Sequence, residues 1–368
     1  MKPTPWKPYV SINLPFRKNI LDELMRGSLS LLRGLKLSYI IYGPLGVGKT
    51  SILLSLIEMI RSNAKSSTLV PIYVDCSRHV LTPGDLLNPF LAALSYTGRI
   101  EYHVMGEIAR IMSSKDVVHL IRMLNEKLID ANIKSLLILD HVEELKHLSR
   151  YWDMRLTPKG IIEEIMNSDA IGLICSFTSL NEANNMFGGL IDLFIVRKVD
   201  RLNKHDTTQL LSSLLKDIVI DDDSLEWIYE LTRGLPLHIH LLAAEILSRE
   251  VKNISIDVLR EIINSALNEP HSILHMGLRI YHHELLKVIR GRNMIVKLLL
   301  LISKGISSAS SIARSMGRPA QYITEYIRRL IEVDVLAHGE RGVIIKDLLY
   351  IKWLSKEFPS NFPLGFQP

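Results

Sequence analysis

The chain has 368 residues, of which 47% are hydrophobic and 23% are charged, so it has ample apolar residues for roughly two or three folded domains. It contains no apolar run of about eighteen residues and begins without the apolar stretch of a signal peptide, so we expect neither a transmembrane helix nor secretion. Its two cysteines lie in strand-like runs and indicate no disulfide framework. We therefore predict a cytoplasmic protein without a membrane partner.

The first 200 residues alternate strand-like runs with helical patterns. Strands are predicted at residues 37–42, 69–75, 136–140, 171–175 and 194–199. Short, wholly apolar strands separated by helices are typical of a parallel sheet covered by helices on both faces. Residues 1–200 are therefore predicted to form an α/β core with a parallel sheet.

A phosphate-binding loop is predicted between the first strand and the next helix, because residues 43–50 fit the pattern G-x-x-x-x-G-K-[ST]. Its glycines let backbone N–H groups face the phosphates, at the positive end of the helix dipole. Lys49 is expected to meet the β- and γ-phosphates of ATP, and the Thr50 hydroxyl to ligate Mg²⁺. The predicted nucleotide contacts here are Gly43, Pro44, Leu45, Gly46, Val47, Gly48, Lys49, Thr50 and Ser51.

The strand at 136–140 ends in Asp140, a carboxylate at the sheet edge that is predicted to hold Mg²⁺ and its waters. Many ATPases place an acid directly after this residue, but here that position is His141. Glu143 and Glu144 follow, and either is a candidate to orient the attacking water, although acids are also favoured at helix starts. Ser176, at the end of the next strand, is a candidate γ-phosphate contact or a simple turn residue.

From about residue 202 the patterns become helical, which predicts a helical lid domain over 201–269. Asn268-Glu269-Pro270 marks a break before a linking helix. That helix carries histidines, which are predicted to be amphipathic surface residues rather than metal ligands: His271, His275, His282 and His283.

The last part, residues 270–368, is predicted to be a linker helix and a winged helix-turn-helix. Helices at 307–315 and 320–331 flank a turn, and two short strands enclose Gly339-Glu-Arg-Gly342. Between residues 294 and 356 there are ten Lys/Arg and five Asp/Glu, so this segment holds the whole net charge of +5. Such an excess suits double-stranded DNA or a merely solvated face. The predicted DNA contacts are Gln321, Thr324, Arg328, Arg329 and Arg341.

These motifs, in this order, resemble the AAA+ and STAND groups of P-loop ATPases, in particular the archaeal STAND-type ATPases. Leu14-Pro-Phe-Arg17 resembles that family's N-terminal element, which implies that Phe16 and Arg17 contact the nucleotide base. Residues 232–237 resemble its G-x-P signature, which implies a nucleotide contact for Pro236. Residues 72–76, followed by Thr82-Pro83, also resemble the archaeal Orc1/Cdc6 replication initiators.

The resemblance implies a switch that binds ATP and Mg²⁺, hydrolyses ATP slowly or conditionally, and couples its nucleotide state to DNA binding. It departs from AAA+ rings in one respect, because residues 181–190 contain no arginine where a finger is expected. Two alternatives stay open: an initiator ATPase, and a regulator whose winged helix holds a protein partner. An oligomer in the ATP state is compatible with each.

Overall fold

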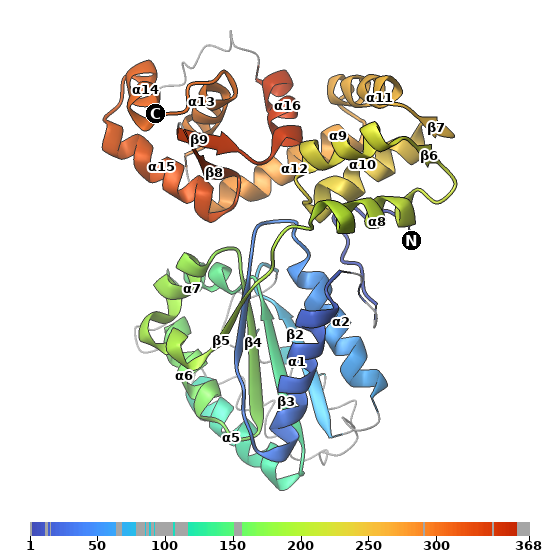
Figure 1. Cartoon of the computed structure of the whole chain (residues 1–368). Coiled ribbons are helices and arrows are strands. Elements are labelled where there is room, and N and C mark those ends of the chain that lie inside the picture. Colours follow the sequence, from blue (N-terminus) through green and yellow to red (C-terminus); the bar gives the residue numbers. More distant parts are fainter. Residues whose placement is uncertain are drawn as a thin grey trace. The chain divides into compact units, whose positions relative to one another are not determined.

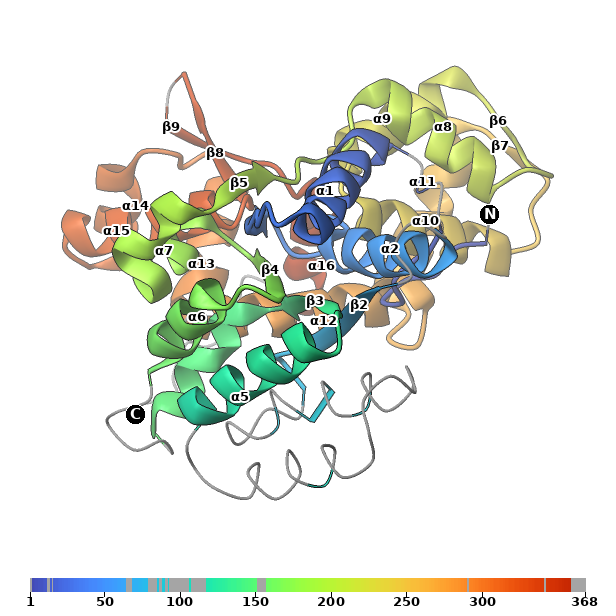
Figure 2. The same ribbon diagram turned by 90° about the horizontal axis from the view of Figure 1, so that it is seen from below.

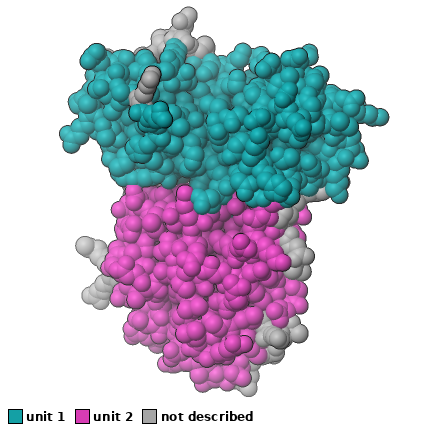
Figure 3. All heavy atoms as spheres, viewed as in Figure 1, with its two compact units in different colours: residues 1–7, 44–48, 200–368 teal, residues 8–43, 49–199 magenta. Residues whose placement is uncertain are grey.

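The computed structural model describes residues 2–11, 14, 16–63, 68–78, 85, 88–89, 92, 106, 117–150, 157–289, 291–340 and 342–358. The chain divides into two compact units (Figure 3). We call the first the core unit; it comprises Pro8–Gly43 and Lys49–Val199. We call the second the helical unit; it comprises Met1–Lys7, Pro44–Gly48 and Asp200–Pro368.

The core unit contains a parallel five-stranded sheet in the order β2-β3-β4-β1-β5. All five predicted strands are present, which confirms the α/β class. Their bounds are β1 Tyr39–Tyr42, β2 Leu69–Asp75, β3 Lys134–Asp140, β4 Ile171–Phe177 and β5 Ile195–Lys198.

Helices cover both faces of this sheet (Figures 1 and 2). One face carries α1 (Lys18–Ser30) and α2 (Lys49–Ser62), and the other carries α5 (Val117–Asp130) and α6 (Pro158–Asn167). The remaining helical segments of this unit are η1 Leu31–Arg33, η3 Val142–Arg150, α7 Leu180–Phe187 and η4 Gly188–Leu193.

Side chains alternate between the two faces along each strand. Leu137 and Leu139 of β3 lie in the hydrophobic core that includes α5 and α6 residues. Asp140 follows Leu139 and therefore points to the opposite face, on which α2 begins. The strand pattern thus places a single buried carboxylate beside the start of a helix.

The helical unit begins with five helices: α8 Lys204–Leu214, α9 Asp222–Thr232, α10 Pro236–Ser248, α11 Ile256–Asn268 and α12 Ile273–Val288. The sequence predicted only helices over 201–269, and this was wrong. Strands β6 (Val219–Ile220) and β7 (Asn253–Ile254) pair in parallel. Each is two residues long, which is too short for a periodic pattern to develop in the sequence.

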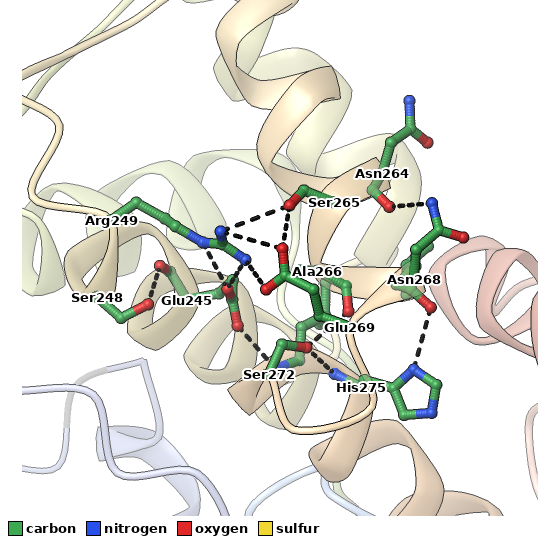
Figure 4. A network of polar contacts seen from close by, with 12 residues as sticks. Glu245, Ser248, Arg249, Asn264, Ser265, Ala266, Asn268, Glu269, Ser272 and His275 are labelled. Carbon is green, nitrogen blue, oxygen red and sulfur yellow. Dashed lines mark hydrogen bonds and ion pairs between the residues drawn. The ribbon is translucent and has the colours of Figure 1, made fainter.

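A polar network joins the ends of α10, α11 and α12 (Figure 4). The buried Glu245 accepts a hydrogen bond from the backbone N–H of Leu274 at 3.0 Å, which caps the start of α12. Arg249 pairs with Glu245 at 2.9 Å and with Glu269 at 2.8 Å. This network fixes where α12 starts relative to the two preceding helices.

Two of the predicted surface histidines are in fact buried, which corrects that prediction. The ring Nδ1 of His275 donates to the carbonyl of Leu267 at 3.0 Å (Figure 4). His282 bonds the hydroxyl of Tyr350 at 2.6 Å. Both histidines point inward because α12 is covered by α10 and α11 on one side and by the C-terminal helix on another.

The last elements of the helical unit are α13 Arg292–Ser303, α14 Ala309–Met316, α15 Ala320–Glu332, β8 Leu336–Gly339, β9 Gly342–Ile345 and α16 Leu348–Glu357. The order of helices and the antiparallel β8–β9 ribbon agree with the order predicted from the sequence. The division of residues 201–368 into two domains stays a prediction. Within the described ranges, no helix has both the length and the apolar character needed to cross a membrane.

Candidate nucleotide-binding site

The segment that joins β1 to α2 has the backbone of a phosphate-binding loop. Gly46 and Gly48 adopt positive φ angles of 78° and 101°, a conformation that is strained for residues with a Cβ atom. The N–H of Gly43 bonds the carbonyl of Phe177 at 3.2 Å, which anchors the first residue of the pattern to β4. The predicted order of strand, glycine-rich loop and helix is present.

Lys49 lies at the first position of α2 and is only 5% exposed. Its ammonium donates a hydrogen bond to the carbonyl of Gly43 at 2.7 Å. Burial lowers the pKa of Lys49, while the carboxylates of Glu143 and Asp140 oppose that shift. A buried cation held against the loop backbone is suited to meeting phosphate oxygens.

Asp140 is fully buried, and four neutral groups donate hydrogen bonds to its carboxylate. Thr50 Oγ1 donates to Oδ2 at 2.7 Å, and the Tyr73 hydroxyl donates to the same oxygen at 2.9 Å. Ser176 Oγ and the backbone N–H of His141 donate to Oδ1, the latter at 3.1 Å. Burial alone raises the pKa of Asp140, but His141, the hydroxyls of Ser176 and Thr50, and the Lys49 ammonium outweigh it and hold the pKa below its ordinary value.

The donor set suits the divalent cation that this class of loop requires. Thr50 Oγ1 and Asp140 Oδ2 are hydroxyl and carboxylate oxygens 2.7 Å apart, and oxygen is the ligand type that Mg²⁺ prefers. The hydrogen bonds from hydroxyls fix the carboxylate without cancelling its charge. Thr50 and Asp140 therefore fit the role predicted for them.

Glu143 and Glu144 lie in different surroundings, and this separates the two candidates. The chain turns sharply at His141, whose φ is 56°, and then enters η3. Glu143 is 3% exposed, and its Oε1 accepts the backbone N–H of Thr178 at 3.2 Å. Its Oε2 has no hydrogen-bond partner among the described residues, whereas Glu144 is half-buried. Burial raises the pKa of Glu143, and Lys49 opposes that shift.

Several predicted nucleotide contacts are already engaged by the protein. Ser51 Oγ accepts the N–H of Tyr9 at 3.1 Å, and Ser176 Oγ bonds Asp140 as described above. Phe16 adopts a positive φ of 63°, and Arg17 directly precedes α1. Their contacts with ATP stay predictions.

Pro236 occupies the first turn of α10, where its missing N–H costs no hydrogen bond. The next residue, Leu237, donates its N–H to the carbonyl of Gly46 at 3.2 Å. A Cβ atom on Gly46 would lie 2.6 Å from the Leu237 Cβ, so glycine is required here for space as well as for conformation. The predicted G-x-P segment is thus in contact with the phosphate-binding loop.

Four of the five predicted DNA contacts lie on α15. Gln321, Thr324, Arg328 and Arg329 are exposed, as predicted, and Arg341 lies outside the described residues. The two arginines are not free, however, since Arg328 pairs with Glu325 at 2.7 Å and with Glu332, and Arg329 pairs with Glu325 at 2.8 Å. The sequence pattern missed these pairs, although their spacing of three and four residues on a helix favours them.

Sequence reasoning also missed Tyr73 as a member of the site. An aromatic residue in a strand is usually a packing residue, and this segment was interpreted only through its resemblance to initiators. The alternation of β2 was the available signal. Ile72 and Val74 lie in the core, so Tyr73 faces the same side of the sheet as Asp140. Burial raises the pKa of Tyr73, and Asp140 raises it further, so the phenol remains a donor.

This loop, its buried lysine and the Thr50–Asp140 pair define a P-loop nucleotide-binding class of protein. Residues 33–187 match the model of the AAA domain family. The resemblance to AAA+ P-loop ATPases is confirmed. No curated protein matches the sequence significantly.

Similar solved structures extend this fold over nearly the whole chain. The Walker-type ATPase of Pyrococcus abyssi superposes with a TM-score of 0.67 and 14% identity, over 95% of this chain and 98% of that one. The Aeropyrum pernix ORC2 protein, solved in ADPNP–ADP complexes, has a TM-score of 0.57 and 15% identity, over 94% and 95%. The Aeropyrum pernix ORC1 protein, solved with DNA, has a TM-score of 0.51 and 16% identity, over 96% and 95%. At these identities the likeness establishes the fold.

Proposed function

We propose that the protein is an ATP- and Mg²⁺-dependent switch whose nucleotide state controls double-stranded DNA binding by its C-terminal segment. The observation that carries the proposal is the Thr50–Asp140 hydrogen bond of 2.7 Å beside a phosphate-binding loop. Lys49 and the loop N–H groups would bind the phosphates, and Thr50 and Asp140 would hold the metal. Bound Mg²⁺ would neutralise charge on the phosphate oxygens.

Slow ATP hydrolysis is part of the proposal, with Glu143 as the residue that orients water. Its Oε1 is fixed by the Thr178 N–H, and its Oε2 remains available as an acceptor. His141 occupies the position of the usual acid after Asp140. The sharp turn of the chain at His141 brings Glu143, two residues later, into the buried site. A single-turnover assay tests this, and the Discussion gives its expected outcome.

A chain of contacts within the helical unit supports coupling between the nucleotide loop and the C-terminal segment. Leu237 bonds Gly46, and the next residue, His238, packs its ring against Tyr281 with centroids 4.9 Å apart. Tyr281 donates to Asp347 at 2.6 Å, and Asp347 directly precedes α16. We propose that a nucleotide-induced shift at Gly46 reaches α16 along this path.

The DNA partner is favoured by charge and by fold. The segment at 294–356 holds the whole net charge of +5, and the similar ORC1 structure was solved with DNA. An initiator role is compatible with the same likeness. The second candidate function is binding of a protein partner, favoured by two exposed side chains on α15 and β9, Tyr322 at 44% and Ile344 at 53%.

The test is fluorescence anisotropy of a labelled duplex with the full chain, measured with ADP and with a non-hydrolysable ATP analogue over a range of salt. We expect salt-dependent affinity that differs between the nucleotides, and no such difference for Lys49→Ala. Salt-independent or absent binding would reject DNA in favour of the protein partner.

Two double variants locate the DNA surface. Arg314 and Arg318 are exposed beside the start of α15, so replacing both with alanine should flatten the salt dependence by about two units of slope. Arg328 and Arg329 already pair with glutamates, so their double alanine variant should change the slope by less. The reverse order would place the phosphates at the far end of α15, at the predicted contacts Arg328 and Arg329.

A further inference from the structure

We infer that Tyr73 is a positioning residue that holds the Asp140 carboxylate in the orientation required for Mg²⁺–nucleotide binding. The inference rests on the proposed Mg²⁺–nucleotide site and adds to it a residue outside its sequence motifs. The carrying observation is the hydrogen bond from the Tyr73 hydroxyl to Asp140 Oδ2 at 2.9 Å.

The strand register explains why a tyrosine is needed at this place. In the β2–β3 pair Asp75 lies opposite Asp140, and Tyr73 lies two residues earlier on the same face. Such diagonal neighbours lie farther apart than directly opposite residues, so a long side chain is needed to span the gap. A phenol has that length and ends in a single donor.

The two oxygens of Asp140 receive matched support from opposite sides. Oδ1 is held by Ser176 on β4 and by the His141 N–H, and Oδ2 is held by Thr50 on α2 and by Tyr73 on β2. Thr50 can direct an oxygen lone pair to a metal ion while its hydrogen still points to Oδ2, and Tyr73 is a second donor to Oδ2 that does not itself belong to the phosphate-binding loop. Tyr73 therefore keeps the plane of the Asp140 carboxylate fixed while Thr50 supplies its hydroxyl oxygen as a metal ligand.

The neutrality of this donor matters as well. A lysine or arginine at position 73 would cancel the charge that attracts the cation, whereas a phenol orients the carboxylate and leaves its charge intact. Tyr73→Phe removes one oxygen atom, retains the ring and leaves Thr50, Ser176 and His141 in place. The Tyr73→Phe variant therefore tests the positioning role of the Tyr73 hydroxyl alone.

The experiment is calorimetric titration of the full chain with ADP, once in Mg²⁺ and once in EDTA. The ratio of the two dissociation constants measures how strongly metal and nucleotide assist one another. We expect Tyr73→Phe to reduce this ratio by roughly tenfold or more, the order expected from loss of one hydrogen bond to a charged group, with the EDTA affinity unchanged. The unchanged EDTA affinity also serves as the folding control.

Two further variants distinguish an error in the role of Tyr73 from an error in the proposed metal site. Tyr39→Phe removes a phenol from β1 of the same sheet, away from Asp140, and should leave the ratio at its wild-type value. Asp140→Asn should bring the ratio close to one. An unchanged ratio in Tyr73→Phe, together with its collapse in Asp140→Asn, would overturn the role of Tyr73 alone. A ratio near one in the wild type would overturn the metal site, and the role of Tyr73 with it.

Discussion

Asp140 in the core unit and Asp347 in the helical unit are both fully buried, but they differ in what balances their charge. Asp140 is hydrogen-bonded by hydroxyls and a backbone N–H, while Lys49 and His141 favour its ionised form. Asp347 receives the Tyr281 hydroxyl at 2.6 Å and an ion pair from Arg201 Nη1 at 2.7 Å. A buried carboxylate paired with a guanidinium is complete within the fold, whereas one held by neutral donors retains its charge for a ligand.

The pairing around Arg201 extends beyond Asp347. Its Nε lies 2.5 Å from a carboxylate oxygen of Asp334, and its Nη2 donates to the Asp334 carbonyl at 2.7 Å. Its Nη1 donates to the carbonyl of Thr232 at 3.3 Å. Arg201 therefore joins the end of α9 to the segments that flank the β8–β9 ribbon. The comparison predicts that Arg201 serves stability and that Asp140 serves binding.

The largest effect is expected from Arg201→Met. The variant leaves two carboxylates, Asp347 and Asp334, without their buried partner, and should lower the free energy of unfolding by about 3–5 kcal/mol. Urea denaturation measures it. The matched control is Arg197→Met, whose ion pair with Glu23 is partly exposed and should contribute less than about 1 kcal/mol. Equal losses in the two variants would contradict the distinction between a buried and an exposed arginine.

A pH effect of slightly smaller size is expected from His238, which lies beside the same cluster. Burial lowers the pKa of His238 to about 4, with Asp347 opposing and Arg201 adding to the shift. Below its ordinary pKa of 6.5 the unfolded chain takes up a proton that the folded chain does not. Stability is therefore complete above pH 6.5 and falls as the pH drops towards 4, by roughly 3 kcal/mol.

Thermal unfolding of the wild type and of His238→Phe between pH 7 and pH 4.5 checks this. The phenylalanine variant should lose less stability over the range, although His240 and His282, whose pKa values burial also lowers to about 4, contribute in both proteins. Parallel curves for the two proteins would show that His238 carries no such effect. The lowered pKa of Asp347 acts only below its ordinary value of 3.8, outside this range.

A third prediction concerns Glu143, the other buried acid near Lys49. Glu143→Gln should slow single-turnover ATP hydrolysis by about 100-fold, since general-base catalysis typically contributes this much, with ATP affinity unchanged. Glu144→Gln is the matched control, one residue away and half-buried, and should stay within a few-fold of the wild type. If the control variant loses more activity than Glu143→Gln, the assignment is wrong.

The Asp140 site and the Arg201 cluster also differ in how far the sequence alone predicts them. The phosphate-binding loop, the strand ending in Asp140 and the five-stranded sheet follow from local patterns, so they were predicted with small errors at the ends. Contacts between distant residues carry no such local signal. Arg201 and Asp334 are 133 residues apart in the chain, so nothing in the local pattern indicates their ion pair.

The sequence did not reveal the contact of Tyr73 with Asp140 or the burial of His282, and the reason is related. Their residue types suit both a packed interior and a polar surface, so only the strand register or the covering helices decide. Tyr73 on β2 bonds Asp140 on the neighbouring strand β3, and His282 on α12 bonds Tyr350 on α16. Register and helix packing emerge from the whole fold, which is why these side chains needed the structure.

The most direct test of the central claim is the thermal unfolding midpoint of Asp140→Asn beside that of Asp347→Asn, each measured with and without Mg²⁺–ADP. The asparagine oxygen at position 140 can accept from Ser176 and the His141 N–H, while its amide can donate to the Thr50 and Tyr73 hydroxyls. Asp140→Asn should therefore melt without ligand only slightly below the wild-type midpoint, since it loses the charge that Lys49 and His141 favour, and should lose the stabilisation by Mg²⁺–ADP. Asp347→Asn should melt well below the wild type and keep that stabilisation. A midpoint for Asp140→Asn as low as that of Asp347→Asn, with stabilisation by Mg²⁺–ADP retained, would contradict the account.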